Sequence, residues 1–442
     1  MTDTAPTSAY PRWKRNVSLF LVGQTVSLFG SMLVQYVVMW YITFETGSGL
    51  ALALYTIAGF LPQGIISIFG GVLADRMNRR LLVIAADTMT ATATLVLALL
   101  MLGGVTDLWV ILVAVAIRSV GAGVQTPAVT AIIPQLTPQD QLMRVNGIFQ
   151  SVQSAMMLLA PVAAGAVYAS FGIIPAFFID VVTAVIGIGM LALVTVPTLA
   201  SISDKTTSYR TDLVDGMRYI WQHHIVRWLL ILFAIIMTLT MAPSFLTPLA
   251  LARNYGEEVW LLTVLEIAFS IGMMGGGVLV ATVLAKKSRI GLILFACFGF
   301  AILNAALGLS IQVLWIFYGF MFLVGVLVPL ISAPFMTLLQ ETVEPEMHGR
   351  VFSYVSIVMA LAAPLGMSVF GPVADAISVE ALLVITGLIT VVVTAVAIAV
   401  PSGRAAIAAA RTAQAESAQA ESAQAESAAA TPAPPPSERA TD

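Results

Sequence analysis

Long apolar segments, separated by short polar stretches or by Gly and Pro, follow one another from residue 17 to residue 400. A helix rises about 1.5 Å per residue, so a hydrocarbon core of about 30 Å takes roughly twenty apolar residues to cross. Twelve segments reach that length and predict an all-α membrane protein with twelve transmembrane helices. The expected spans are 17–43, 50–74, 81–104, 108–131, 142–169, 173–196, 226–251, 259–285, 290–309, 312–338, 350–376 and 379–400.

The longest polar interruption separates six spans from six, and the two halves share local sequence. Pro161 in span five and Pro364 in span eleven each lie in an apolar run that follows an Arg-Val pair, and both predict helix kinks. Duplicated halves with a site at their interface are typical of secondary transporters. We therefore expect two pseudo-symmetric six-helix bundles.

The domain boundaries follow from the same pattern. Within the interruption, Leu213 to Gln222 has helical spacing and is expected to lie along the membrane surface. After Pro401 the chain becomes low-complexity, with Ala-Gln-Ala-Glu-Ser three times, which predicts a disordered tail. The expected parts are an N-terminal segment 1–16, a first bundle 17–196, a loop 197–225, a second bundle 226–400 and a tail 401–442.

Composition and charge agree with a lipid-facing exterior. Hydrophobic residues make up 59% of the chain and charged residues 10%, against about 25% charged in an average soluble protein. Sixteen Lys and Arg residues fall on the side of the two termini, and only Arg253 falls on the other side. This positive-inside bias predicts a multi-pass protein of the cell membrane with both termini in the cytoplasm. The net charge of −3 gives no reason to expect a nucleic-acid partner.

Several kinds of chemistry have no motif here. The sequence contains no G-x-x-x-x-G-K followed by Ser or Thr, no H-E-x-x-H and no Cys/His cluster, so we expect no ATP hydrolysis by this chain, no metal and no cofactor. A membrane enzyme would need a catalytic group near a span, and no His or Cys is suitably placed. A membrane enzyme and a non-transporting sensor stay open as remote alternatives.

The connection between spans two and three is the most specific local signal. Its sequence reads Gly71-Val72-Leu73-Ala74-Asp75-Arg76-Met77-Asn78-Arg79-Arg80. An ordinary positive-inside loop would explain the arginines but not Asp75. Asn78 is expected to adopt the left-handed backbone that a tight turn needs.

This loop resembles the signature G-x-L-A-D-R-x-G-R-R of the major facilitator superfamily, and Asn78 is its only departure. The resemblance implies the major facilitator fold and a gating role for the loop. Asp75 would then lie against the N-terminus of span eleven and hold the cytoplasmic side shut. A carboxylate near a helix N-terminus is stabilised by roughly 0.3–1 kcal/mol. The residues implicated in gating are Gly71, Asp75, Arg76, Arg79 and Arg80.

Charged residues inside spans are costly unless they face the protein interior or water. Arg118 in span four resembles the superfamily element R-x-x-x-G-x-G, whose Arg is associated with proton coupling. Asp87, Asp180 and Glu266 lie in spans three, six and eight, where a carboxyl group shielded from water can exchange a proton near neutrality. These four residues are the proton-coupling candidates, with Glu266 first. The alternative for any one of the acids is a structural ion pair with Arg118.

A wider resemblance, to the macrolide-efflux branch of the drug–proton antiporters, covers nearly the whole membrane region. The stretches that carry it include Trp13-Lys14-Arg15, Gly23-Gln24-Thr25-Val26-Ser27-Leu28, Glu45-Thr46-Gly47-Ser48, Gly59-Phe60-Leu61-Pro62, Glu266-Ile267-Ala268-Phe269 and Gly349-Arg350-Val351-Phe352-Ser353. In span five, Ala160-Pro161-Val162-Ala163-Ala164-Gly165 resembles the exporter element G-P-x-x-G-G.

The resemblance implies a monomeric exporter of amphiphilic small molecules such as macrolides, driven by the proton gradient through alternating access. Its partners would be the small-molecule substrate, protons and the lipid bilayer. By position alone, the candidates to line the substrate cavity are Gln35, Met39, Gln63, Gln125, Gln153 and Met157. Export of a native metabolite such as a siderophore, or lipid flipping by the same fold, stays open as the alternative.

Overall fold

The computed structural model describes residues 12–195, 209–285 and 287–401, most positions from 403 to 415, and only the backbone of residues 68–76 and 209–213. The first bundle consists of α1 (Trp13–Thr46), α2 (Gly49–Arg76), α3 (Arg79–Leu102), α4 (Leu108–Leu136), α5 (Leu142–Phe171) and α6 (Ile174–Ala192). The second consists of α8 (His224–Leu239), α9 (Met241–Tyr255), α10 (Val259–Thr282), α11 (Arg289–Ser310), α12 (Leu314–Thr342), α13 (His348–Ala376) and α14 (Val379–Ala399).

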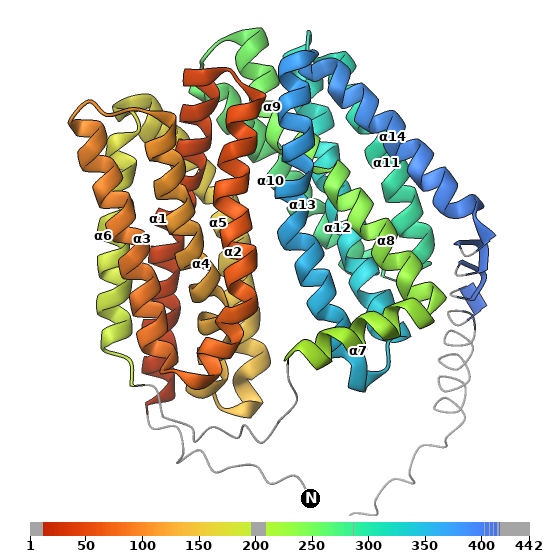
Figure 1. The fold of residues 1–442 in the computed structure, drawn as a ribbon, viewed down its shortest axis with the longest axis horizontal. Coiled ribbons are helices and arrows are strands. Elements are labelled where there is room, and N and C mark those ends of the chain that lie inside the picture. Colours follow the sequence, from red (N-terminus) through yellow and green to blue (C-terminus); the bar gives the residue numbers. More distant parts are fainter. Residues whose placement is uncertain are drawn as a thin grey trace, which may run out of the picture.

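The described chain contains 12 helical segments long and apolar enough to cross a membrane, which confirms the predicted membrane protein. The bundles stand side by side in Figure 1. Short 3-10 turns, η2 (Gln139–Gln141) and η3 (Pro345–Met347), precede α5 and α13, the two helices that share local sequence. The described positions after Pro401 are mainly helical, and residues 416–442 of the predicted tail lie outside the described part.

The helix predicted between the bundles is present as α7 (Tyr209–Gln222), which crosses the end of the second bundle (Figure 1). The start of α1 lies on the same side of the molecule. We call this side the terminal face and the opposite side the remote face. Residues 196–208 of the predicted loop lie outside the described part.

The seventh span differs from the single uninterrupted helix expected over 226–251. It is divided into α8 and α9 at Thr240, which is in a turn. Pro243 has no N–H, so it cannot bond to the Leu239 carbonyl, and the regular helix stops there. Gly366 of α13 packs against this break: a Cβ at Gly366 would lie 2.8 Å from the Thr238 carbonyl oxygen.

The most extensive contacts between the bundles are those of α2 with α13 and of α5 with α10, and α9 also touches α1 and α2. Small residues allow the close approach that is typical of membrane helices. A Cβ built on Gly371 would lie 2.4 Å from the Gly49 carbonyl oxygen and 2.5 Å from the Ala53 Cβ. In contrast, the side chains of α5 nearest the terminal face, from Asn146 to Ser154, are mostly exposed. The bundles therefore meet tightly at the remote face and separate towards the terminal face.

The glycine contact gives a stability test. Gly371→Val should force α2 and α13 apart and destabilise the fold by about 1–3 kcal/mol, as overpacking usually does. The midpoint of thermal unfolding in detergent should fall accordingly. Gly319→Val is the matched control, because a Cβ there would meet no described atom within 4 Å other than those of its own stretch of helix. Equal midpoints for the two variants would contradict this packing.

Candidate functional site

An ion pair lies in the interior of the first bundle. The Arg118 guanidinium of α4 donates to Asp180 Oδ2 of α6 and to Thr94 Oγ1 of α3. Thr94 donates to the same carboxylate over 2.9 Å, and Ser31 of α1 donates to Asp180 Oδ1 over 3.3 Å. Asp180 is 1% exposed. Asp180 is therefore the acid that forms an ion pair with Arg118, and residues of α1, α3 and α4 surround its carboxylate.

Asp87 of α3 has a different environment. It is 4% exposed, and its Oδ1 accepts from Ser27 Oγ of α1 and from the Gln125 amide of α4. Its Oδ2 is buried and has no hydrogen-bond partner among the described residues, and the same holds for the amide nitrogen of the buried Gln24. No cation contacts Asp87 among the described side chains. The charge of this carboxylate is therefore uncompensated, which is costly inside a membrane bundle.

Glu266 of α10 has no hydrogen bond or ion pair to the part of the chain that the structure describes. It lies on the face of α10 that meets α5 of the opposite bundle: Thr263, three residues before it, packs against Gly165, and Ser270, four residues after it, donates to the Met157 carbonyl at 3.1 Å. Glu266 thus faces the opposite bundle, whereas Asp87 lies wholly within its own.

A polar cluster at the remote face joins the two bundles, and we call it the remote latch. The Asp375 carboxylate, near the end of α13, accepts from the Gly49 and Leu50 N–H groups at 2.7 and 2.9 Å and from Ser48 Oγ at 2.8 Å. It therefore caps the N-terminus of α2, where a carboxylate is stabilised by the unpaired N–H groups and the helix dipole. Arg253 of α9 bonds to Asp375 at 2.8 Å and to the Gly47 carbonyl at 2.7 Å.

Sequence reasoning did not identify the remote latch. Asp375 and Gly49 are 326 positions apart, so no local motif contains both. The available signal was Arg253, the lone basic residue outside the spans on the side away from the termini. A lone cation on a face otherwise free of basic residues is a candidate for a specific contact.

The signature loop is only partly described. Gly71, Asp75 and Arg76 lie in the stretch with undescribed side chains, so the predicted contact of Asp75 with α13 lies outside the described residues. Arg79 donates to the Ala131 carbonyl of α4 at 2.9 Å, and Arg80 donates to the Ala192 carbonyl at the end of α6. These arginines anchor the loop to its own bundle.

The expectation for Asn78 was wrong. Its backbone is extended, with φ −64° and ψ 109°, instead of left-handed. The Asn78 side chain accepts from the Arg80 and Leu81 N–H groups at 3.0 and 3.4 Å. Asn is favoured at this position because it is the N-cap of α3.

The six cavity candidates have different environments. Gln35 and Gln153 are exposed, Gln63 is half-buried, and Met39 is buried at 7% exposure. The Gln125 amide donates a hydrogen bond to Asp87, and the Met157 carbonyl accepts one from Ser270 of α10 at 3.1 Å. Their role in substrate binding stays a prediction. The predicted kink residues Pro161 and Pro364 are buried within the continuous helices α5 and α13.

Comparisons with known proteins agree with this architecture. A family model described as the Major Facilitator Superfamily matches residues 20–367. Macrolide efflux protein A of Streptococcus pyogenes is 31% identical over 380 residues, which cover 86% of this chain and 94% of the relative. Multidrug efflux pump Tap of Mycolicibacterium fortuitum is 23% identical over 361 residues, which cover 77% of this chain and 85% of the relative. A mutant of the nucleoside transporter NupG has the same fold, with a TM-score of 0.70 and 11% identity over 88% of this chain and 99% of that one.

The buried ion pair predicts a specific energetic coupling. Asp180→Asn leaves Arg118 buried without a neutralising charge, which should cost about 3–5 kcal/mol and lower the thermal unfolding midpoint. The double variant Asp180→Asn/Arg118→Gln keeps polar groups but no charge, so it should recover most of that loss.

The matched control for this cycle is Glu341→Gln, which breaks the Arg289–Glu341 pair at the surface. That pair is 2.7 Å long with side chains 32% and 49% exposed, so its loss should cost less than about 1 kcal/mol. A double variant less stable than Asp180→Asn alone would contradict the coupling.

Proposed function

Because this chain belongs to the major facilitator superfamily of transporters, we propose that it is a proton-coupled exporter of amphiphilic small molecules such as macrolides. The macrolide efflux protein from Streptococcus pyogenes, 31% identical over 86% of this chain, supports the substrate class. The multidrug efflux pump Tap supports export as the direction. We expect the protein to act as a monomer without a cofactor.

The observation that carries proton coupling is the presence of two interior carboxylates with no cationic partner among the described residues, Asp87 and Glu266. An unpaired carboxylate in a membrane interior is stabilised by taking up a proton, which removes its charge. Asp180 differs, because Arg118 already neutralises it. Asp87 and Glu266 are therefore the proposed proton carriers, and Arg118 and Asp180 the fixed frame beside them.

The positive-inside bias supports a cytoplasmic terminal face. The remote latch then closes the outer side, and exposure of α5 towards the terminal face corresponds to an inward-facing state. We propose that the remote latch and the signature loop form in turn, the latch closing the outer side and the loop closing the cytoplasmic side. Asp375 ends α13 and caps α2, while Asp75 ends α2 and would cap α13. The two helices would exchange one carboxylate–dipole contact for the other during alternating access.

The remote latch can be tested by accessibility. With Cys297 replaced by Ala, Gln35→Cys provides a single exposed thiol. Asp375→Asn removes the capping charge, worth about 1 kcal/mol, so the outward-open population should rise roughly fivefold. A membrane-impermeant maleimide applied from the remote side should then label Gln35→Cys faster. Asp107→Asn, an exposed acid on the same face, is the control; equal labelling in both variants would contradict the latch.

Transport itself is tested by extrusion of a macrolide panel from cells expressing each variant. A proton driving force of 100 mV supplies about 2.3 kcal/mol per proton, enough for a gradient of roughly fiftyfold. Wild type should lower accumulation, a protonophore should abolish the effect, and Glu266→Gln and Asp87→Asn should abolish or strongly reduce it at normal membrane levels. Glu257→Gln, an exposed loop acid, should stay active.

Two outcomes would contradict this function in different ways. Extrusion that persists with a protonophore would remove proton coupling but keep export. Accumulation unchanged by expression would remove the drugs tested as substrates and turn attention to a native metabolite or a lipid.

A further inference from the structure

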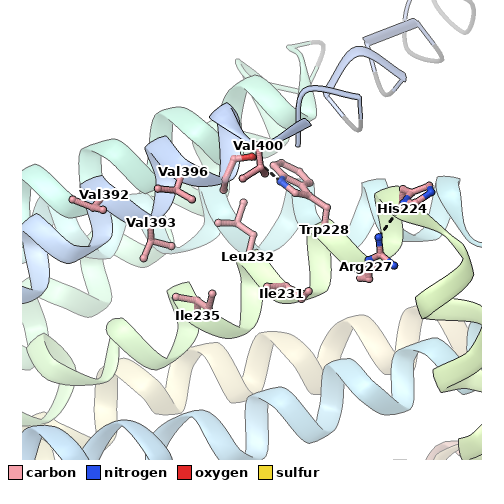
Figure 2. A pocket seen from close by; sticks show the side chains of 11 residues that line it. His224, Arg227, Trp228, Ile231, Leu232, Ile235, Val392, Val393, Val396 and Val400 are labelled. Atoms are coloured by element: carbon pink, nitrogen blue, oxygen red, sulfur yellow. Dashed lines mark hydrogen bonds between the residues drawn. The ribbon is translucent and has the colours of Figure 1, made fainter. Parts of the chain in front are cut away.

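An apolar groove of about 340 Å³ runs between α8 and α14 on the outside of the second bundle (Figure 2). Its walls are Ile231, Leu232 and Ile235 from α8 and Val392, Val393 and Val396 from α14. Ile231, Val392 and Val396 are 51–60% exposed, so this surface faces the bilayer. Its length lies along two membrane helices, as an acyl chain would.

The end of the groove near the terminal face is basic. It is formed by Arg227, His224 and Trp228 at the start of α8. Arg227 donates to the Trp221 carbonyl at 2.8 Å and lies over the Trp221 ring at 5.4 Å. Among the described residues no carboxylate pairs with Arg227, so its charge is held in place but not neutralised.

His224 adds a second donor. Its Nδ1 lies 3.0 Å from an Arg227 nitrogen. Arg can only donate, so Nδ1 accepts and the proton of the neutral ring lies on Nε2. An N–H group and a guanidinium at one end of an apolar groove match the oxygens of a phosphate.

The adjoining helix α7 sets the depth of this basic end. Val214, Met217 and Trp221 recur at helical spacing on one face and are 60%, 41% and 59% exposed. The opposite face is turned inwards, with Tyr219 and Ile220 buried. An exposed apolar face on a helix at the end of a membrane bundle lies in the headgroup–acyl boundary. Because α8 begins two residues after α7 ends, Arg227 and His224 lie at the depth of the lipid phosphate groups.

From these contacts we infer that the groove is a binding site for one anionic phospholipid of the leaflet at the terminal face, with its phosphate on Arg227 and His224 and an acyl chain between α8 and α14. Basic pockets between membrane helices are known to hold anionic headgroups. The chain after Thr412 has no large apolar side chain that could fill the groove instead.

A second groove in the same protein provides an internal comparison. It lies between α3 and α4 with a volume of about 600 Å³, and its lining includes Met89, Val96, Trp109 and Val113 but no charged side chain. Lipids there have apolar contacts alone. Preference for an anionic headgroup should therefore arise at the α8/α14 groove and not at the α3/α4 groove.

The test uses the purified full-length chain in mild detergent and counts bound lipids by native mass spectrometry. Phosphatidylglycerol and phosphatidylcholine with matched acyl chains are titrated separately. Phosphatidylglycerol should bind roughly fivefold more tightly, the effect of the one charged base, Arg227. Arg227→Gln keeps an amide donor and should remove most of this preference, while Val396→Trp fills the groove and should weaken both lipids. Arg144→Gln, an exposed base on the same face, should change neither affinity.

Three results would overturn the site: equal binding of the two lipids to wild type, an equal loss of preference in Arg144→Gln, or displacement of the bound lipid by millimolar inorganic phosphate. Equal binding would mean that the groove does not select its lipid. An equal loss in Arg144→Gln would mean that general surface charge causes the preference. Displacement by phosphate would mean that the site binds free anions. None depends on drug transport, so the outcome is independent of the proposed export.

Discussion

The ion pair between Arg118 and Asp180 fixes the interior of the first bundle. A guanidinium cannot lose its charge there, so a carboxylate has to reach it. Asp180 does so from α6, Thr94 and Ser31 bond to the same carboxylate from α3 and α1, and four helices are held around one charge pair. Close approach of α1 and α6 makes this geometry possible: a Cβ on Gly30 would lie 2.9 Å from the Asp180 Cα. Because Arg118 pairs with Asp180, it does not neutralise Asp87 or Glu266, and these acids lose their charge only by binding a proton.

Motion between the bundles depends on a weaker interaction. The remote latch holds α2 and α13 together through hydrogen bonds to one partly exposed carboxylate, and its Asp375 and Arg253 side chains are each 32% exposed. Such a contact is worth about 1 kcal/mol, far less than the buried pair. The strength of the two interactions therefore matches their positions: the strong pair lies within a bundle, and the weak contact lies where bundles must separate.

Much of the fold could be predicted because bilayer thickness and the cost of unpaired backbone groups leave few choices. The twelve spans, the surface helix α7 and the likeness of α5 to α13 all came from local pattern. Pairings between distant residues did not, since nothing local distinguishes which of Asp87, Asp180 and Glu266 reaches Arg118. The break at Thr240 was missed because Pro243 lies in an otherwise continuous apolar run. Asn78 was misassigned because N-capping and left-handed turns favour the same residue.

The two unpaired acids differ in what a proton on each can do. Asp87 is surrounded by α1, α3 and α4, so its environment changes little when one bundle moves against the other. Glu266 lies on the face of α10 that meets α5 of the opposite bundle, so separation of the bundles there brings water to it and closure removes that water. A charged carboxylate is favoured by water and disfavoured by closure. On the proposed mechanism, the proton on Glu266 is therefore the one whose free energy depends on the conformation, and such a difference is what coupling requires.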